Sequence, residues 1–316
     1  MTVISAFLGT GGGGPVTPTN VIALTVTSIG TLGTGSFTLP AGWTSYSTII
    51  CIGGGGSGAN SGSSTTIGDV RNAGGGGGAA WAEVTGLGTA GGTVYYQIGY
   101  GGTQNPSIPV SGAVGRAGQI TWVNFTTPAQ PSVSTDGAAA GAGGAGQLGF
   151  TSNSSGGSAL VGTLGYNGGA GSAALTGTSA RGGGGAGAGG RNPAGTTAGN
   201  APNITNNAQA GVSGSGASQP DTTSGLSGIV GTAVTNAFTV TSDTLSGSFT
   251  NTTILSVSSL VGAGTGGNGG AGGAGFSSPG PGGSGAYGAG GGGGGRVTVS
   301  GEYGGVGGNG LIILYF

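Results

Sequence analysis

The residues able to do chemistry are few, and the closest pair of acids is Asp69 and Glu83, with Arg71 between them. Two carboxylates at a suitable separation are what glycoside hydrolysis requires. The surroundings favour a plainer interpretation, because Asp69 follows a polar, glycine-rich stretch and Glu83 lies in a predicted strand. We expect a solvated loop acid and a strand-exposed acid rather than a catalytic pair.

Other catalytic chemistries lack their essential residue types. The chain has no histidine and no lysine. Ser-His-Asp and Cys-His systems are therefore excluded, as are zinc sites built from His and Cys clusters and the lysine-dependent Walker A loop. Matches to G-x-G-x-x-G are expected by chance when 87 of 316 residues are glycine. The sequence predicts a protein that is not an enzyme and that holds no cofactor or metal.

Charge is equally scarce, with five basic and six acidic residues and a formal net charge of −1. Binding to nucleic acid or to an anionic membrane surface depends on clustered basic residues. The five arginines are dispersed along the sequence, so we expect no nucleic-acid partner. Their positions are Arg71, Arg116, Arg181, Arg191 and Arg296.

Cys51 is the only cysteine, so no disulfide can form within the chain. It stands in the apolar run 49–52, which indicates a buried small side chain rather than a reactive thiol. Residues 1–10 lack the charged and apolar regions of a secretory signal. We therefore expect synthesis in the cytoplasm and no export by a cleaved signal, which leaves open an extracellular destination on a particle released by lysis.

Strand patterns dominate the first half of the chain. We divide the chain into an N-terminal anchor or linker (1–20), a β-rich region (21–136) and a glycine-rich region (137–316). Runs of β-branched and aromatic residues predict strands that form a sandwich or jelly-roll-like core. The predicted strands are 21–29, 36–40, 46–52, 79–85, 93–100 and 120–125.

Glycine in the second half recurs with a period of three residues. In the block 266–275 the other residues are Asn268, Ala271 and Ala274. Period three fits neither an α-helix nor a strand, but it is the period of a polyproline II-type helix, which has no internal hydrogen bonds. We expect a bundle of polyglycine II helices that bond sideways through their backbones.

Two further segments interrupt or end the glycine-rich region. Residues 219–261 are β-like again, and we expect a hairpin that projects from the bundle. The apolar run 311–316 predicts a C-terminal strand that returns to the β-core beside the buried run 48–52. Left unpaired, such a strand would be an aggregation-prone edge.

The order of these segments carries a resemblance. Phe37-Thr38-Leu39-Pro40-Ala41-Gly42 precedes a strand that runs into Gly53–Gly56, and the chain closes on Gly307-Gly308-Asn309-Gly310 followed by 311–315. Between them stand Gly74–Gly78 with Ala79–Val84, and Tyr95–Gly102. Over residues 35–316 this order resembles the glycine-rich domain of bacteriophage tail-fibre and related virion proteins. It is also similar in kind to phage adhesins whose polyglycine helices present variable loops to host receptors.

The resemblance implies a structural virion protein of a phage tail, a tail fibre or tail-tip component. Its implied partners are other tail proteins, a bacterial surface receptor (an outer-membrane protein or a glycan) and further copies of the chain, with a trimer as one option. Loops between glycine-rich helices, such as 150–164, 191–210 and the insertion, would contact the receptor. The candidate residues are Phe150, Tyr166, Arg191, Asn192, Asn203, Asn206, Asn207, Phe238 and Phe249.

Other interpretations remain open at this point. Phe150 and Tyr166 flank glycine blocks and are expected to cap helix ends more readily than to stack on sugars. A capsid fibre or decoration protein without a receptor role would suit the same composition. An ice-binding or surface-adhesive protein would use neutral Thr, Ala and Gly faces, although no regular Thr array occurs. A glycine-rich cell-wall protein is disfavoured by the order of the strands.

Overall fold

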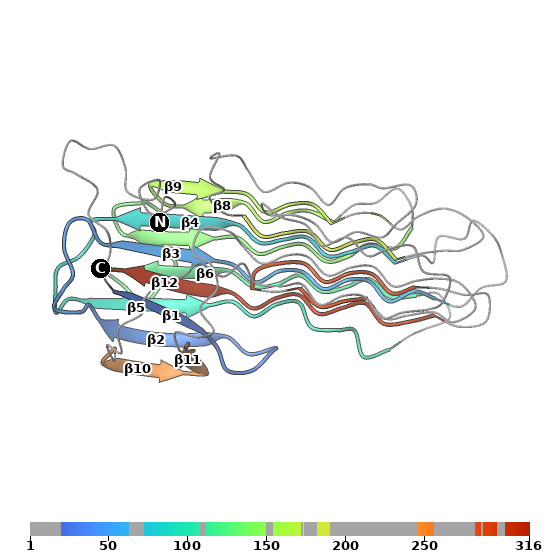
Figure 1. Ribbon diagram of the computed structural model, residues 1–316, viewed down its shortest axis with the longest axis horizontal. Helices are drawn as coiled ribbons and strands as arrows, with labels where there is room; N and C mark the ends of the chain where they lie inside the picture. Colours follow the sequence, from blue (N-terminus) through green and yellow to red (C-terminus); the bar gives the residue numbers. More distant parts are fainter. Residues whose placement is uncertain are drawn as a thin grey trace.

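The computed structural model describes residues 20–62, 73–107, 112–149, 154–171, 173, 182–189, 245–255, 282–285, 287–295 and 301–316. In this part of the chain it is all-β, with two antiparallel sheets and no helix, which confirms the all-β prediction (Figure 1). Among these residues no helical segment could cross a membrane. The two sheets stack as a sandwich, and extended glycine-rich segments continue away from one end of it.

The sheets contain six strands each. The first sheet has the order β11 (Thr252–Ile254), β1 (Val21–Val26), β12 (Leu311–Tyr315), β3 (Thr48–Ile52), β4 (Trp81–Thr85) and β9 (Leu164–Tyr166). The second has the order β10 (Gly247–Thr250), β2 (Gly33–Thr38), β5 (Thr93–Ile98), β6 (Thr121–Asn124), β7 (Gly137–Ala140) and β8 (Ala159–Val161). As the sequence predicts, β12 lies beside β3, and its other neighbour is β1.

Two pairs of consecutive strands cross from one sheet to the other at the sides of the sandwich. Strands β8 and β9 are consecutive but belong to different sheets, and so are β10 and β11. The expectation that the insertion forms a hairpin projecting from the bundle is therefore wrong for 247–254, because β10 pairs with β2 and β11 with β1. At the turn, Asn251 adopts a φ of 48° and its amide donates to the carbonyl of Thr31 at 2.8 Å.

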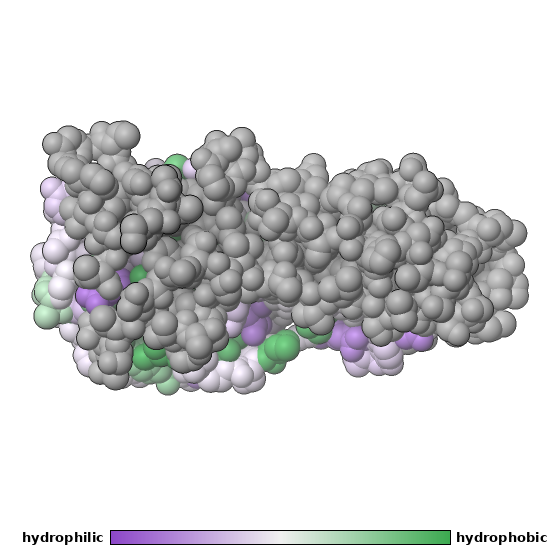
Figure 2. All heavy atoms as spheres, viewed as in Figure 1, coloured by the Kyte–Doolittle hydropathy of each residue, from purple (hydrophilic) through white to green (hydrophobic). Residues whose placement is uncertain are grey.

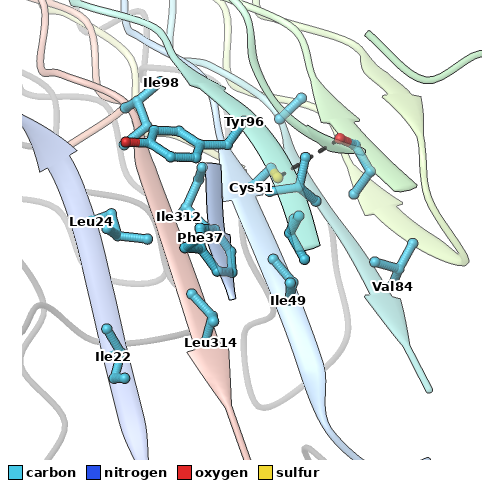
Figure 3. Packing of buried hydrophobic residues seen from close by; sticks show 14 of the residues in the cluster. Ile22, Leu24, Phe37, Ile49, Cys51, Val84, Tyr96, Ile98, Ile312 and Leu314 are labelled. Atoms are coloured by element: carbon cyan, nitrogen blue, oxygen red, sulfur yellow. Dashed lines mark hydrogen bonds between the residues drawn. The ribbon is translucent and has the colours of Figure 1, made fainter. Parts of the chain in front are cut away.

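The space between the sheets is filled by aliphatic and aromatic side chains (Figure 3). Ile49 and Cys51 of β3 face Phe37 and Tyr96 of the other sheet, whose rings lie 5.8 Å apart. Cys51 is fully buried, which confirms its predicted role as a small core residue. Burial raises the pKa of its thiol well above the ordinary range, so it stays protonated and unreactive.

The four central strands of the first sheet, β1, β12, β3 and β4, are buried on both faces. Alternate residues of β3 and β12 point away from the second sheet, yet Ile50 and Ile313 are fully buried there as well. Trp81 and Tyr315 belong to the same outer cluster. Continuous burial explains why β3 and β12 read as unbroken apolar runs rather than as alternating strands.

Strands β7, β8 and β9 are absent from the sequence prediction. The run Gly137–Ala140 carries none of the β-branched or aromatic residues that mark a strand. Its small residues suit a crowded position, since Ala138 and Ala140 are fully buried in the inter-sheet core. Pairing with β6 and β8, rather than intrinsic preference, makes this segment a strand.

Most of the glycine-rich segments continue directly from strands. We call the set 53–62, 73–80, 99–107, 112–120, 141–149, 154–158, 167–171, 182–189, 282–285, 287–295 and 301–310 the glycine array. Residues 53–62 extend β3, 73–80 lead into β4, and 301–310 lead into β12. Segments from both sides of residue 137 therefore lie in the same array, side by side along its length (Figure 1).

Hydrogen bonds in the array run sideways between segments, and the partner segment changes with a period of three residues. Along 53–62, successive backbone N–H groups donate to 73–80, then to 112–120, then to 301–310, and the cycle repeats twice. The bonds are Gly53 to Ala80, Gly54 to Gln119, Gly55 to Gly308, Gly56 to Gly77, Ser57 to Arg116, Gly58 to Gly305, Ala59 to Gly74, Asn60 to Ala113 and Ser61 to Glu302, at 2.8 to 3.2 Å. Backbone groups without internal partners are thus satisfied laterally.

Segment 53–62 lies at the centre of this arrangement. Its carbonyls accept from Gly143, Gly102 and Gly291, which belong to three further segments, so six segments surround it. No room remains for side chains on most of its sides. A Cβ on Gly56 would lie 1.9 Å from the carbonyl oxygen of Gly144, far inside van der Waals contact. The uninterrupted glycine runs are therefore the interior of the array.

Peripheral segments need glycine only where they face inward. Along 112–120 the buried glycines are Gly112, Gly115 and Gly118, and exposed residues such as Val114 and Ala117 stand between them. A Cβ on Gly118 would lie 2.1 Å from the carbonyl oxygen of Gly54. Glycine thus recurs every three residues because every third residue of such a segment faces a neighbouring segment. The block 266–275, where the period is clearest, lies outside the described residues.

Candidate functional site

The glycine array has one end at the sandwich and one end away from it, and most described segments of the array break off or resume at the second. Segments 53–62, 99–107 and 141–149 run away from the sandwich, and 73–80, 112–120 and 154–158 return to it. Segments 167–171 and 287–295 also run away from the sandwich, and 182–189 and 301–310 return to it. Five stretches of sequence therefore join segment ends that lie on that side, and we call them the distal connections: 63–72, 108–111, 150–153, 174–181 and 296–300. We call this side the distal end (Figure 1). The structure does not describe the connections themselves.

The described segment ends at the distal end are bonded to one another. Ala59 donates to Gly74 at 3.0 Å, Gly74 to Gln147 at 2.8 Å and Gly294 to Ala59 at 3.1 Å. The array thus keeps its lateral bonding up to the point where the connections begin. A rigid platform of this kind is what positions binding loops in many folds.

Asn60 is the polar centre of the distal end. It is fully buried, and its amide nitrogen donates to the carbonyls of Asn105 at 2.9 Å and Ser107 at 2.6 Å. Its side-chain oxygen accepts from the N–H of Gly304 at 2.9 Å. One side chain therefore joins segments 53–62, 99–107 and 301–310. Asn60 lies in the part of segment 53–62 where larger residues replace the continuous glycine run Gly53–Gly56.

Two serines of the same segment also bond to neighbouring backbone. The Ser57 hydroxyl accepts from the N–H of Arg116 at 2.8 Å. The Ser61 hydroxyl donates to the carbonyl of Gly295 at 2.6 Å and accepts from the N–H of Glu302 at 2.8 Å. The sequence analysis missed these residues. The signal that could have found them is polar residues that interrupt a glycine run at a spacing of three or four.

Replacing Asn60 tests this network. Asn60→Ala leaves a buried N–H and two carbonyls without a partner, and we expect a loss of about 2 kcal/mol in unfolding free energy. Asn60→Asp should destabilise more at neutral pH, because a carboxylate would face two carbonyl oxygens. Urea denaturation measures both variants, with Ser132→Ala at an exposed position as the control. A native stability of Asn60→Asp would contradict the assigned bonds.

Most predicted receptor-binding residues lie outside the described residues. These are Phe150, Arg191, Asn192, Asn203, Asn206, Asn207 and Phe238. The predicted contact loops at 191–210 and in most of 219–261 are likewise outside.

The two described candidates are far from each other and face the core. Tyr166 is on β9 at one side of the sandwich, and its ring lies 5.2 Å from that of Trp81. Phe249 is on β10 at the opposite side of the other sheet, with its ring 6.2 Å from that of Tyr96. The structure does not bring them together, and each is partly buried against an aromatic core residue.

Glu83 is not where the sequence places it. We expected a strand-exposed acid, but the residue is only 5% exposed, on the outer face of β4 beside the apolar cluster. The error arises because the alternation of β4 suggests a solvated outer face, whereas this sheet is buried on both faces. Asp69, the other member of the acid pair, lies outside the described residues.

Tyr315 shares this outer face with Glu83. Burial, and to a smaller extent the negative charge of Glu83, raise the pKa of the Tyr315 phenol. Burial likewise raises the pKa of Tyr96, while a hydrogen bond to Thr252 acts in the opposite direction. Both phenols are therefore neutral at physiological pH.

These shifts predict alkaline unfolding. A phenol whose pKa is raised on folding stabilises the protein fully below its ordinary pKa of 10.0, and the stabilisation is lost as the pH rises above that value. Tyr315→Phe should therefore shift the unfolding midpoint in an alkaline titration to higher pH, as measured by tryptophan fluorescence. Tyr46→Phe, at an exposed position, should leave the midpoint unchanged. An identical midpoint for wild type and Tyr315→Phe would contradict the assignment.

The described surface offers neither a metal site nor one dominant apolar patch. No group of three or more metal-ligating side chains occurs in the part of the chain that the structure describes. Its large exposed apolar residues, among them Ile29, Val114 and Val133, belong to different elements. On the face drawn in Figure 2, apolar and polar residues are mixed wherever described atoms are visible.

Comparison with known proteins adds no assignment to this geometry. No protein-family model matches the chain, and no curated protein shows significant similarity to it.

Proposed function

We propose that the segments of the glycine array are three-fold helices of the polyglycine II type. Such helices have three residues per turn and no internal hydrogen bonds. Lateral bonding with a period of three residues supports this assignment, as does a central segment with six neighbours. A bundle of this kind is stiff because each helix is held on several sides by backbone.

The chain is proposed to be a structural protein of a bacteriophage tail, a tail fibre or tail-tip component. Its distal connections contact a receptor on the bacterial surface, either an outer-membrane protein or a glycan. The observation that carries the proposal is the gathering of five connections at one end of a laterally bonded array. Residues 1–20 join the chain to other virion proteins, and Asn20 lies at the end of the sandwich opposite to the array.

The scarcity of charged residues in the chain suits a binding module whose contacts depend little on salt. Direct chemistry at the receptor is not required, so the role fits a chain without histidine or lysine. Recognition by a neutral surface rests on shape and hydrogen bonding, and it is screened weakly by ions. In the assembled particle, the chain is proposed to associate with further copies of itself.

Host adsorption tests the receptor role. Connections 108–111 and 150–153 are each replaced by Gly/Ser segments of equal length in the full chain on the assembled particle. Adsorption to the host should fall, while Val133→Ser at the opposite end of the sandwich should leave it unchanged. Hydrogen exchange of the array confirms that each variant is folded. Unchanged adsorption after replacement of all five connections would reject the receptor role.

If adsorption is unchanged, a capsid fibre or decoration protein without a receptor role is the alternative function. Labelling of the chain on the particle separates the two, because label on the head would reject the tail assignment. Label on the tail with unchanged adsorption would leave a purely structural tail component.

A further inference from the structure

The direction of the strands relative to the two ends of the molecule has a mechanical consequence. Strand β1 begins at the sandwich end, where Asn20 and Phe316 exchange backbone hydrogen bonds at 2.9 and 3.0 Å. The distal end of the array lies at the other extreme of the same long axis (Figure 1). All strands and array segments run along this axis, and their hydrogen bonds run across it.

We infer that the fold is a load-bearing coupler, resistant to tension along its long axis and weak when its sandwich end is pulled apart. The inference rests on the proposed function only for the source of the load, which would be a particle at one end and a cell surface at the other. The directional strength itself follows from the hydrogen-bond geometry.

Axial tension loads many bonds at once. Pulling β1 outward at Asn20 slides it past β12, with five paired positions, and past β11, with three. At the distal end, tension on 99–107 is carried by β5, which pairs over six positions with β2 and three with β6. In antiparallel ladders the bonds are perpendicular to the strands, so sliding requires all pairs of a strand to break together.

Tension between Asn20 and Phe316 acts differently. These residues are neighbours at the same end of adjacent strands, so separating them opens the Asn20–Phe316 pair first. Val21 and Tyr315 follow, and each later pair opens only after the one before it. Each step breaks the bonds of one pair rather than those of a whole ladder.

Single-molecule force spectroscopy on the full chain tests the inference. Two versions of the protein are compared, and both carry one pulling handle before residue 1. In the axial version the second handle is attached to Ser107→Cys, at an exposed distal position. In the sandwich-end version the second handle follows Phe316. The native Cys51 is buried and does not compete for the thiol chemistry.

We expect the force at unfolding to be several-fold higher for the axial pair than for the pair at the sandwich end. Equal forces, or a lower axial force, would overturn the inference. The result is independent of adsorption, so a failed receptor test with a high axial force rejects only the receptor role. Axial weakness with intact adsorption rejects only the mechanical role.

Discussion

Gly77→Ala is expected to prevent formation of the glycine array. A Cβ at this position would lie 1.9 Å from the carbonyl oxygen of Ser155 and 3.1 Å from the backbone nitrogen of Gly144. Both atoms are backbone, so neither can move aside as a side chain does. The N–H of Gly77 also donates to Gly144 at 2.9 Å, and any displacement lengthens this bond. We expect a loss of at least about 3 kcal/mol, the upper end of overpacking effects.

Urea denaturation and amide hydrogen exchange across 53–62 and 73–80 measure this effect. The control is Gly42→Ala, an exposed position where the new Cβ would meet only the ring of Phe316, at 3.2 Å. Its effect on stability should be far smaller than that of Gly77→Ala, because the neighbour that must shift is a side-chain ring and not backbone. If Gly77→Ala is as stable and as protected from exchange as the wild type, the close approach of Gly77 to Ser155 and Gly144 is disproved, and with it the polyglycine II assignment.

Ile313→Ala should destabilise the protein as much as Ile312→Ala. These neighbours in β12 point to opposite faces of the first sheet, and both are fully buried. Truncation of a buried isoleucine leaves a cavity and costs about 2–5 kcal/mol. A sandwich with a solvated outer face would instead tolerate the change at Ile313 with little loss.

The midpoint of urea unfolding measures both variants. Ile29→Ala is the matched control, since this side chain is 52% exposed and its loss should change stability by only about 0.5 kcal/mol. A small effect of Ile313→Ala together with a large effect of Ile312→Ala would show that the outer face of the first sheet is open to solvent in solution.

Much of the sandwich could be predicted from local patterns. The β-branched and aromatic runs locate β1, β3, β5 and β6, and the unbroken apolar run 311–315 indicates a strand buried on both faces. Each of these signals lies within a few residues of sequence. The pairing of β12 with β3 was also predictable, because only another fully buried strand suits such an apolar neighbour.

Strands β7 to β9 and the burial of Glu83 could not be predicted in the same way. Gly137–Ala140 has no local preference for a strand and becomes one through its neighbours. Glu83 has the alternation of a half-exposed strand, but the face on which it lies is covered. In both cases the deciding interaction comes from residues distant in sequence.

The sequence by itself determined an all-β chain, a thiol held in the core and glycine spaced for lateral bonding. Only the tertiary structure decided which glycine segments are enclosed, how Asn60 joins three of them and that the described segment ends lie together at one end. The physical reason is that the glycine content and its spacing show only where another segment can come close to the backbone. The approaching partner is set by contacts such as the bond from the Thr25 hydroxyl to the Gly310 carbonyl, which spans 285 positions of the chain.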